Sequence, residues 1–182
     1  MKHARLLLRA AAIAAGLMVA QAHAQSNVVD VGKSVPSEKA VAEGLFPEEA
    51  CEQLKAAGFK CMGFKPAVRY SLPATSFKLG SAELPDALKK QLDVFADVLK
   101  TRKGSGKTVV IEGHADASGA AALNKQLSQQ RADAVKDYLV QQGADASMLK
   151  PVGVGADDLK NPNDPYGAEN RRVEIGRANP PS

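Results

Sequence analysis

Residues 109–131 read VVIEGHADASGAAALNKQLSQQR, and three different patterns follow one another within this segment. The apolar run at residues 109–111 predicts a buried strand. Small and polar residues at positions 115–119 then break the strand into a loop. From about residue 121 the apolar side chains recur at helical spacing, so a helix is expected there. The segment therefore predicts a strand–loop–helix unit, which is typical of α/β domains.

Oppositely charged side chains lie on the two sides of this loop. Asn124, Ser128 and Arg131 are spaced so that they share one helix face, and Asp116 lies in the loop at the head of that helix. We therefore expect a carboxylate and a guanidinium to flank one short crevice, which suits a ligand that carries both an ammonium group and a carboxylate. Alternatively, Asp116 and Arg131 could pair with each other, and such a partly exposed pair would contribute at most about 1 kcal/mol.

The elements before and after this segment complete the predicted fold. Apolar spacing and turn residues predict strands at residues 75–79, 149–155 and 172–175, and a helix at residues 84–103. Residues 68–72, in the connector before the domain, could form a further short strand. We expect the buried stripe of the helix after the loop to consist of Leu123, Leu127, Ala134, Val135, Tyr138 and Leu139. Together these elements predict one α/β domain over residues 74–178, which is long enough to bury a single core.

The first 24 residues have the features of a secretory signal peptide. Basic residues at the start are followed by an apolar stretch at residues 10–20, which is too short to cross a bilayer as a helix. The sequence AHA at residues 22–24 is a typical cleavage signal, so the mature chain should begin near Gln25; a retained anchor is the alternative. No cysteine follows directly after this site, and we therefore do not expect a lipid anchor there.

Removal of residues 1–24 changes the charge of the protein. The whole chain carries 24 Lys and Arg against 20 Asp and Glu, a formal net charge of +4. The signal segment contains three basic residues and no acidic ones, so the mature chain keeps 24 − 3 = 21 basic residues against 20 acidic ones. A nearly neutral protein does not have the charge that is typical of nucleic-acid binding, so we expect no nucleic-acid partner.

Two cysteines, Cys51 and Cys61, fall in an extension at residues 25–73 that precedes the main domain. Because an exported chain meets an oxidising compartment, we expect these cysteines to form a disulfide around a short helix. A closed loop of this length would stabilise the fold by about 3 kcal/mol. The first part of the extension, residues 26–44, has little pattern and is interpreted as a tail or a loosely held strap. The stapled helix is too small for a core of its own, so it should pack on the main domain or bind a partner.

Features that could indicate catalysis or cofactor binding do not fit those functions. The GSGKT sequence at residues 104–108 lacks the first glycine of a P-loop and precedes a strand instead of a helix. His114 is the only histidine after the signal segment, and one histidine is too few to hold zinc. We expect His114 to have a structural role at its strand end, and we expect no metal ion and no cofactor. Of Arg171 and Arg172, one should lock the last strand to the central loop while the other faces solvent; we assign the structural role to Arg171.

Several of these motifs resemble the signature of the OmpA-like C-terminal domain. The similarity covers roughly residues 74–177 and comprises GHAD at 113–116, Gly119, Leu123-Asn124, Leu127-Ser128, Arg131-Ala132, Ala134-Val135, Tyr138-Leu139, Gly143, Gly153, Gly155 and NRRVEI at 170–175. The resemblance implies an α/β fold of the order β-α-β-α-β-β, in which a small mixed sheet carries its helices on one face.

The resemblance also implies a ligand. Domains of this kind bind peptidoglycan without cleaving it, through the diaminopimelate side chain of the wall peptide. By this similarity Asp116 would hold the ammonium group and Arg131 the carboxylate of diaminopimelate. Asn124 would add hydrogen bonds, and backbone groups around Leu79 and Gly80 would close the far side of the crevice.

These expectations lead to one main hypothesis and two alternatives. The main hypothesis is a non-catalytic periplasmic protein, associated with the outer membrane or the cell wall, that tethers envelope components to peptidoglycan. An outer-membrane or envelope protein could then bind residues 25–73. The first alternative is an adaptor between envelope proteins, in which Asp116 and Arg131 form a structural pair. The second is a cell-wall hydrolase, although the sequence has no recognisable paired-carboxylate, zinc or Ser/His/Asp arrangement.

Overall fold

The computed structural model describes residues 27–63, 65–73, 77–78 and 80–178, so the predicted signal segment and Leu79 lie outside the described residues. In chain order, the helices and strands are β1 (Val28–Asp30), α1 (Glu38–Leu45), α2 (Pro47–Ala56), β2 (Arg69–Pro73), α3 (Asp86–Lys100), β3 (Val109–His114), α4 (Ala121–Gln141), η2 (Ala146–Met148), β4 (Leu149–Gly155), η3 (Ala168–Asn170) and β5 (Arg172–Arg177). Within the described ranges, no helix is both long and apolar enough to cross a bilayer.

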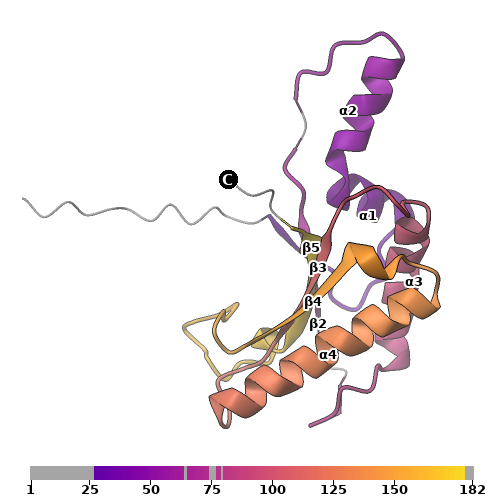
Figure 1. Cartoon of the computed structure of the whole chain (residues 1–182). Coiled ribbons are helices and arrows are strands. Elements are labelled where there is room, and N and C mark those ends of the chain that lie inside the picture. The colour runs from indigo at the N-terminus through magenta and orange to yellow at the C-terminus, as the bar shows by residue number, and fades with distance from the viewer. Residues whose placement is uncertain (1–26, 64, 74–76, 79, 179–182) are drawn as a thin grey trace, which may run out of the picture.

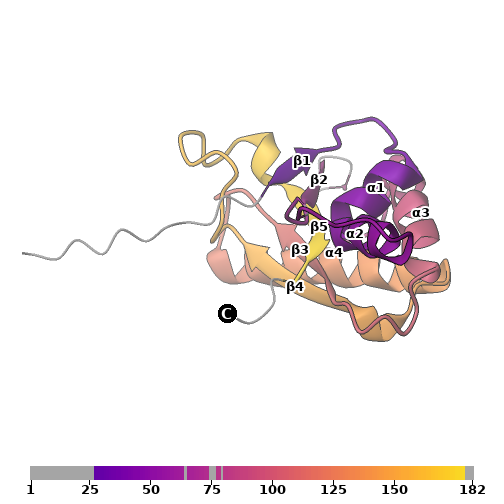
Figure 2. The ribbon, with the colours of Figure 1, turned by 90° about the horizontal axis from the view of Figure 1, so that it is seen from above.

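The five strands form one mixed sheet in the order β1-β2-β5-β3-β4. Strand β1 runs parallel to β2, and β3 runs parallel to β4, whereas β5 is antiparallel to both of its neighbours. Helices α3 and α4 pack against each other on one face of this sheet, and α1 packs beside α3 (Figures 1 and 2). This arrangement confirms the predicted α/β fold, with a small mixed sheet and helices on one face.

The hydrophobic core fills the space between the sheet and α3. The residues of α3 whose spacing predicted this helix are all buried, namely Leu88, Leu92, Phe95 and Leu99. On the sheet side, Tyr70 packs edge-on against Phe95, with 5.4 Å between the ring centroids. Ile111 and Ile175, from the neighbouring strands β3 and β5, are completely buried. The core therefore joins α3 to the central strands.

Helix α4 approaches the sheet through glycines. A Cβ atom on Gly113 would lie 2.1 Å from the carbonyl oxygen of Ser128, and one on Gly153 would lie 2.5 Å from the amide nitrogen of Gln129. The α4 backbone can therefore come this close to β3 and β4 only because side chains are missing there. Ser128 Oγ accepts a hydrogen bond of 2.9 Å from the Gly155 amide, and Gln129 Oε1 accepts one of 2.6 Å from the Gly153 amide. These bonds fix the position of α4 along β4.

The buried face of α4 agrees with the predicted stripe at Val135 and Leu139 but differs from it elsewhere. It consists of Ser128, Arg131, Ala132, Val135 and Leu139. Leu123, which we expected to be buried, is 65% exposed. The N-terminal half of α4 lies directly against Gly113 and Gly153 of the sheet. This close contact leaves no room for a leucine side chain between them.

The described part of the expected tail or loosely held strap, residues 27–44, is instead ordered on the main domain. Strand β1 pairs with β2 at the edge of the sheet. Helix α1 begins at a capping serine, Ser37, whose side chain accepts a hydrogen bond from the Ala40 amide at 3.2 Å. Val41 and Leu45, one turn apart on α1, are completely buried in the main core. This segment is therefore part of the sheet and of its core.

The strand expected at residues 75–79 lies largely outside the described residues. Of these residues the structure describes only Phe77 and Lys78, which belong to no strand. The strand that pairs antiparallel with β5 is β2, which confirms the short strand considered at residues 68–72. Its alternate residues Tyr70 and Leu72 are buried in the core, which explains the preference for this position. The sheet thus takes in residues on both sides of the expected domain boundary.

Cys51 and Cys61 form the expected disulfide, with 5.4 Å between their Cα atoms. The bond closes a hairpin in which α2 leads outward and the following segment returns (Figure 1). We call residues 50–63 the stapled hairpin. Its base is held to the body by Glu49 in α2, whose carboxylate accepts two hydrogen bonds from Arg102, at 2.9 and 2.7 Å. The hairpin itself projects away from the sheet and from α4 (Figure 1).

Candidate functional site

Asp116 lies in the loop that directly follows the central strand β3. It is 7% exposed, its Oδ1 accepts a hydrogen bond from the Ser118 amide at 2.9 Å, and its Oδ2 accepts one from Arg171. Burial acts to raise the pKa of Asp116, but the hydrogen bonds from Arg171 and Ser118 outweigh burial and hold this pKa below its ordinary value. The carboxylate is therefore charged at neutral pH, and each of its oxygens keeps a lone pair for a further donor.

Arg131 lies on α4 and is only 5% exposed. Its Nε donates to the Ser81 carbonyl at 3.1 Å, and its guanidinium carbon lies 4.8 Å from the centre of the Phe77 ring. Within the described residues, no carboxylate oxygen lies within 4.0 Å of its nitrogens. Burial lowers the pKa of Arg131, and the positive charge of Arg171 lowers it further. A buried cation that has no close counter-ion lowers the stability of the fold.

Asp116 and Arg131 lie near enough to affect each other's charge, because the carboxylate acts to raise the pKa of the guanidinium. They do not form an ion pair, since the partner of Asp116 is Arg171. The structural pair that we considered as an alternative is therefore not the arrangement found. Instead, Arg171 at the start of β5 holds the loop after β3 through Asp116, while Arg131 is held from the other side by the segment before α3.

A shallow groove of about 280 Å³ runs along the exposed side of α4. It is lined by Gly80, Leu123, Asn124, Gln126, Leu127 and Gln130. Asp116 and Arg131 do not line this groove, but Asn124 connects it to the first of them. The amide nitrogen of Asn124 donates to the carbonyl oxygens of Asp116 and Ser118, at 3.1 and 2.7 Å. Gly80, which has a φ of 67°, directly precedes the serine that holds Arg131.

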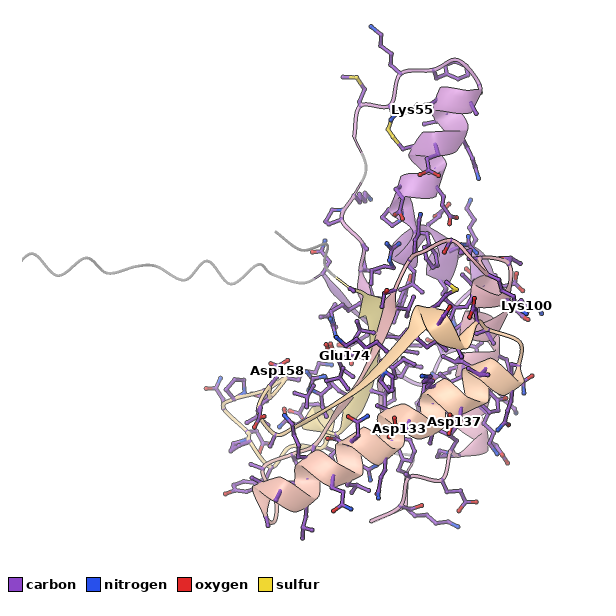
Figure 3. The ribbon with its side chains drawn as sticks, in the orientation of Figure 1. Lys55, Lys100, Asp133, Asp137, Asp158 and Glu174 are labelled. Carbon is purple, nitrogen blue, oxygen red and sulfur yellow. A yellow bond between two sulfur atoms is a disulfide. The ribbon has the colours of Figure 1, made fainter. Side chains whose placement is uncertain are left out.

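A second group of charged side chains lies on the opposite face of the sheet, where Figure 3 labels Glu174 and Asp158. Arg172 is 4% exposed, and its Nε donates to Glu174 at 2.6 Å. Arg69 donates to the other oxygen of Glu174 at 3.0 Å. We expected Arg172 to face solvent, and this was wrong. Its charge is needed to balance the buried carboxylate of Glu174, two residues further along the same strand face.

His114 is part of this group and is completely buried. Its Nδ1 lies 3.2 Å from the carbonyl oxygen of Asp158, and its Nε2 lies 3.8 Å from the carboxylate of Glu112. Burial and the nearby charge of Arg172 lower the pKa of His114 to about 4. The imidazole is therefore neutral at pH 7, with the Nδ1 proton directed to the carbonyl.

Glu112, His114 and Glu174 bring three potential metal-ligand atoms within 4.8 Å of one another. However, Arg69 donates to both carboxylates and Arg172 donates to one of them. Two guanidinium charges at such short range oppose a bound cation. We therefore interpret the group as an ion-pair network that joins β2, β3 and β5.

The comparison with known proteins identifies the family of this chain. The sequence profile of the OmpA family matches residues 76–172, which is more than half of the chain. The chain belongs to the OmpA family. The matched region runs from the segment that holds Arg131 to the start of β5, and so it includes Asp116, Arg131 and Arg171.

Several relatives share this region with the OmpA-family chain. It is 39% identical over 107 residues to a peptidoglycan-associated lipoprotein of Pseudomonas aeruginosa, covering 54% of this chain and 58% of the relative. It is 40% identical over 102 residues to the probable lipoprotein YiaD of Escherichia coli, covering 55% and 46%. It is 37% identical over 102 residues to the peptidoglycan-binding protein ArfA of Mycobacterium bovis, covering 55% and 31%. The chain thus matches less than two thirds of the length of these relatives.

Solved structures show the same fold. The OmpA-like domain of FopA1 from Francisella tularensis superimposes with a TM-score of 0.51 at 26% identity, covering 61% of this chain and 75% of that domain. The peptidoglycan-associated lipoprotein from Burkholderia pseudomallei superimposes with a TM-score of 0.51 at 24% identity, covering 59% and 89%. The fold of the OmpA-family chain is therefore shared with both.

Sequence reasoning missed the residues that hold Arg131. Phe77 lies against the guanidinium of Arg131, and no spacing in the sequence indicates this contact. The contact from Ser81 is made by a backbone carbonyl and leaves no signal in the sequence. The choice of Arg171, and not Arg131, as the partner of Asp116 depends on how the last strand of this OmpA-family chain is placed in the sheet.

Proposed function

We propose that this chain is a non-catalytic cell-envelope protein that binds peptidoglycan through the diaminopimelate side chain of the wall peptide. Such binding would tether envelope components to the wall and would place the protein in the periplasm, at the outer membrane or at the wall itself. The names of two relatives, a peptidoglycan-associated lipoprotein and a peptidoglycan-binding protein, support this proposal.

The observation that carries the proposal is the state of Arg131. A buried guanidinium held by a backbone carbonyl and an aromatic ring, with no carboxylate close to it among the described residues, is ready to accept one from a ligand. An arginine presents a planar fork of donors that fits a carboxylate with two parallel hydrogen bonds. The side chain of diaminopimelate ends in a carbon that carries both a carboxylate and an ammonium group, so the ammonium group would reach Asp116.

The energetics fit a modest affinity for each site. A hydrogen bond to a charged group contributes about 1.5–3 kcal/mol, and the ligand would make such bonds to both residues. Part of this gain is offset because Asp116 must share its carboxylate with Arg171. Many identical peptides on one polymer raise the effective concentration of ligand, so weak individual sites can still hold the protein to the wall.

Co-sedimentation with insoluble, protein-free peptidoglycan tests the proposal. The chain from residue 25, which keeps every residue that the structure describes, is mixed with wall of the diaminopimelate type and with wall of the lysine type. The lysine-type wall lacks the side-chain carboxylate that Arg131 would hold. The variant Arg131→Met is compared with Lys136→Met, a control further along α4.

The proposal predicts sedimentation with the diaminopimelate wall only, lost in Arg131→Met and kept in Lys136→Met. Equal sedimentation with both walls, or none with either, would contradict the assignment. The supernatant is also assayed for soluble wall fragments, because their release would favour a hydrolase instead of a binding protein.

A further inference from the structure

The stapled hairpin buries almost nothing of itself. Among residues 50–63, Cys51 is the one buried side chain in this described segment. Three apolar side chains are instead presented to solvent: Leu54 is 48% exposed, Phe59 is 64% exposed and Met62 is 96% exposed. The hairpin is fixed by a disulfide but has no core of its own. Its apolar side chains can therefore be buried only against another surface.

Positive charge surrounds these apolar side chains. Between residues 50 and 66 the sequence has three lysines, Lys55, Lys60 and Lys65, against one glutamate, Glu52. All three lysines are exposed, and none is in an ion pair with another described residue. In Figure 3, Lys55 lies toward the outer end of α2.

Two of the three acidic residues of α2 lie at its other end, where they form ion pairs with the body. Glu48 forms ion pairs with Lys107 and Arg177, and Glu49 pairs with Arg102. Burial acts to raise the pKa of Glu48, but the hydrogen bonds from Lys107 and Arg177 outweigh it and lower this pKa to about 2. The base of α2 is therefore held on the body by its negative charges, while the outer end is apolar and positive.

We propose that the stapled hairpin is a membrane-docking element that inserts its apolar side chains into the surface of an anionic bilayer. Phe59 and Met62 would enter the boundary between headgroups and acyl chains, and Lys55 and Lys60 would lie among the lipid phosphates. A protein partner fits this surface less well, because protein interfaces are depleted in lysine and enriched in arginine, and the hairpin has no arginine.

The position of the hairpin leaves the Asp116 crevice accessible. Its base contacts Lys107 and Arg177, next to the first residue of β3, whereas Asp116 follows the last residue of β3. Six strand residues separate the two ends, roughly 20 Å at the usual rise per residue. A bilayer at the hairpin would therefore not cover the crevice, and binding at the hairpin does not depend on wall binding.

A tryptophan probe tests this inference, because the chain contains no tryptophan. The variant Phe59→Trp, in the chain from residue 25, is titrated with vesicles of phosphatidylethanolamine and phosphatidylglycerol and with vesicles of phosphatidylcholine alone. The matched control is Tyr166→Trp, since Tyr166 is 66% exposed but lies far along the chain from the hairpin. We expect a blue shift of the emission from position 59 with anionic vesicles only, and no shift from position 166.

Vesicle flotation of chains that keep Phe59 supplies the second measurement. Met62→Ser should weaken binding about fivefold or more, and Lys55→Gln and Lys60→Gln should each weaken it about fivefold at low salt. The controls Val35→Ser and Lys150→Gln change an exposed apolar residue and an exposed lysine elsewhere and should leave binding unchanged. Absence of any vesicle binding, or equal binding by all variants, would overturn the inference and favour a protein partner.

Discussion

The carboxylate of Asp116 is paired with Arg171, a residue 55 positions later in the chain, and not with Arg131 on the adjacent helix. This contact joins the loop after β3 to the start of β5, so it holds the carboxylate in place before any ligand arrives. It also leaves Arg131 as a buried cation without a close carboxylate among the described residues. The two arginines therefore have different roles, one as support for the loop and one as the proposed ligand contact.

The first prediction separates these roles by replacing Arg171 with glutamine. Arg171→Gln should lower the free energy of unfolding by about 1 kcal/mol, because the pair is partly exposed. Wall binding at pH 7 should be kept, whereas Asp116→Asn should weaken it about tenfold or more. Urea unfolding and co-sedimentation measure the two effects. Loss of binding in a folded Arg171→Gln protein, together with unchanged binding in Arg131→Met, would show that Arg171, and not Arg131, contacts the ligand.

The second prediction concerns stability and binding at Arg131. Because the charge is buried without a close counter-ion, Arg131→Met should leave the melting temperature unchanged or raise it, while wall binding is lost. Thermal unfolding followed by circular dichroism provides the measurement. A fall in stability of about 2 kcal/mol or more would indicate that the guanidinium is held in place mainly for the fold.

The strands and helices that could be predicted from the sequence are those whose apolar residues face the core directly. In α3, Leu88, Leu92 and Phe95 recur at helical spacing and are all buried, so the pattern and the structure agree. In α4 the apolar spacing wrongly predicted that Leu123 is buried. The helix contacts the sheet through glycines, and Leu123 is exposed to solvent. Gly153, a glycine inside a strand, was the available signal for such a close approach.

The N-terminal segment and the candidate site show what sequence patterns leave out. Helix α1 has a capping serine at Ser37 and a short apolar stripe at Val41 and Leu45, a pattern too brief to stand out beside its polar neighbours. The contact of Arg171 with the loop after β3 confirms its expected structural role, but the identity of its partner, Asp116, could not be derived from spacing, because it depends on the order of strands in the sheet. The order places β5 between β2 and β3, and this brings Arg171 to the loop.

The third prediction follows from the buried imidazole of His114. Its pKa falls from 6.5 to about 4 on folding, so between these values the unfolded chain binds a proton that the folded chain does not. Stability should therefore be fully present above about pH 6.5 and should decrease by about 3 kcal/mol as the pH falls to 4. Urea unfolding at several pH values measures this slope.

The control for this slope is His114→Asn, whose side-chain amide can still donate to the Asp158 carbonyl. Its stability should be lower at neutral pH, because the smaller side chain leaves a cavity, but it should vary less between pH 6.5 and 4. An unchanged slope in this variant would mean that other groups, such as the carboxylate of Glu174, whose pKa the charge of Arg172 lowers despite burial, cause the acid sensitivity. Burial raises the pKa of Glu112, so protonation of this group acts in the opposite direction.

The fourth prediction tests the contact between α4 and the sheet. In Gly113→Ala the new Cβ would lie 2.1 Å from the Ser128 carbonyl oxygen, so the helix must move away. We expect a loss of about 3 kcal/mol or more in the free energy of unfolding. Gly104→Ala is the control: it has a φ of 71° but nothing within 4 Å, and it should cost only about 1 kcal/mol. Similar losses in both variants would show that space at Gly113 is not limiting.

The central claim is that Arg131 holds the side-chain carboxylate of diaminopimelate, and isothermal titration calorimetry with soluble wall peptides tests it most directly. One peptide carries free diaminopimelate, and a second is identical except for lysine in its place. We expect the first peptide to bind and the second to bind at least about tenfold more weakly. We expect Arg131→Met to lose this preference for diaminopimelate over lysine. Equal affinity for both peptides, or an unchanged preference in Arg131→Met, would contradict it.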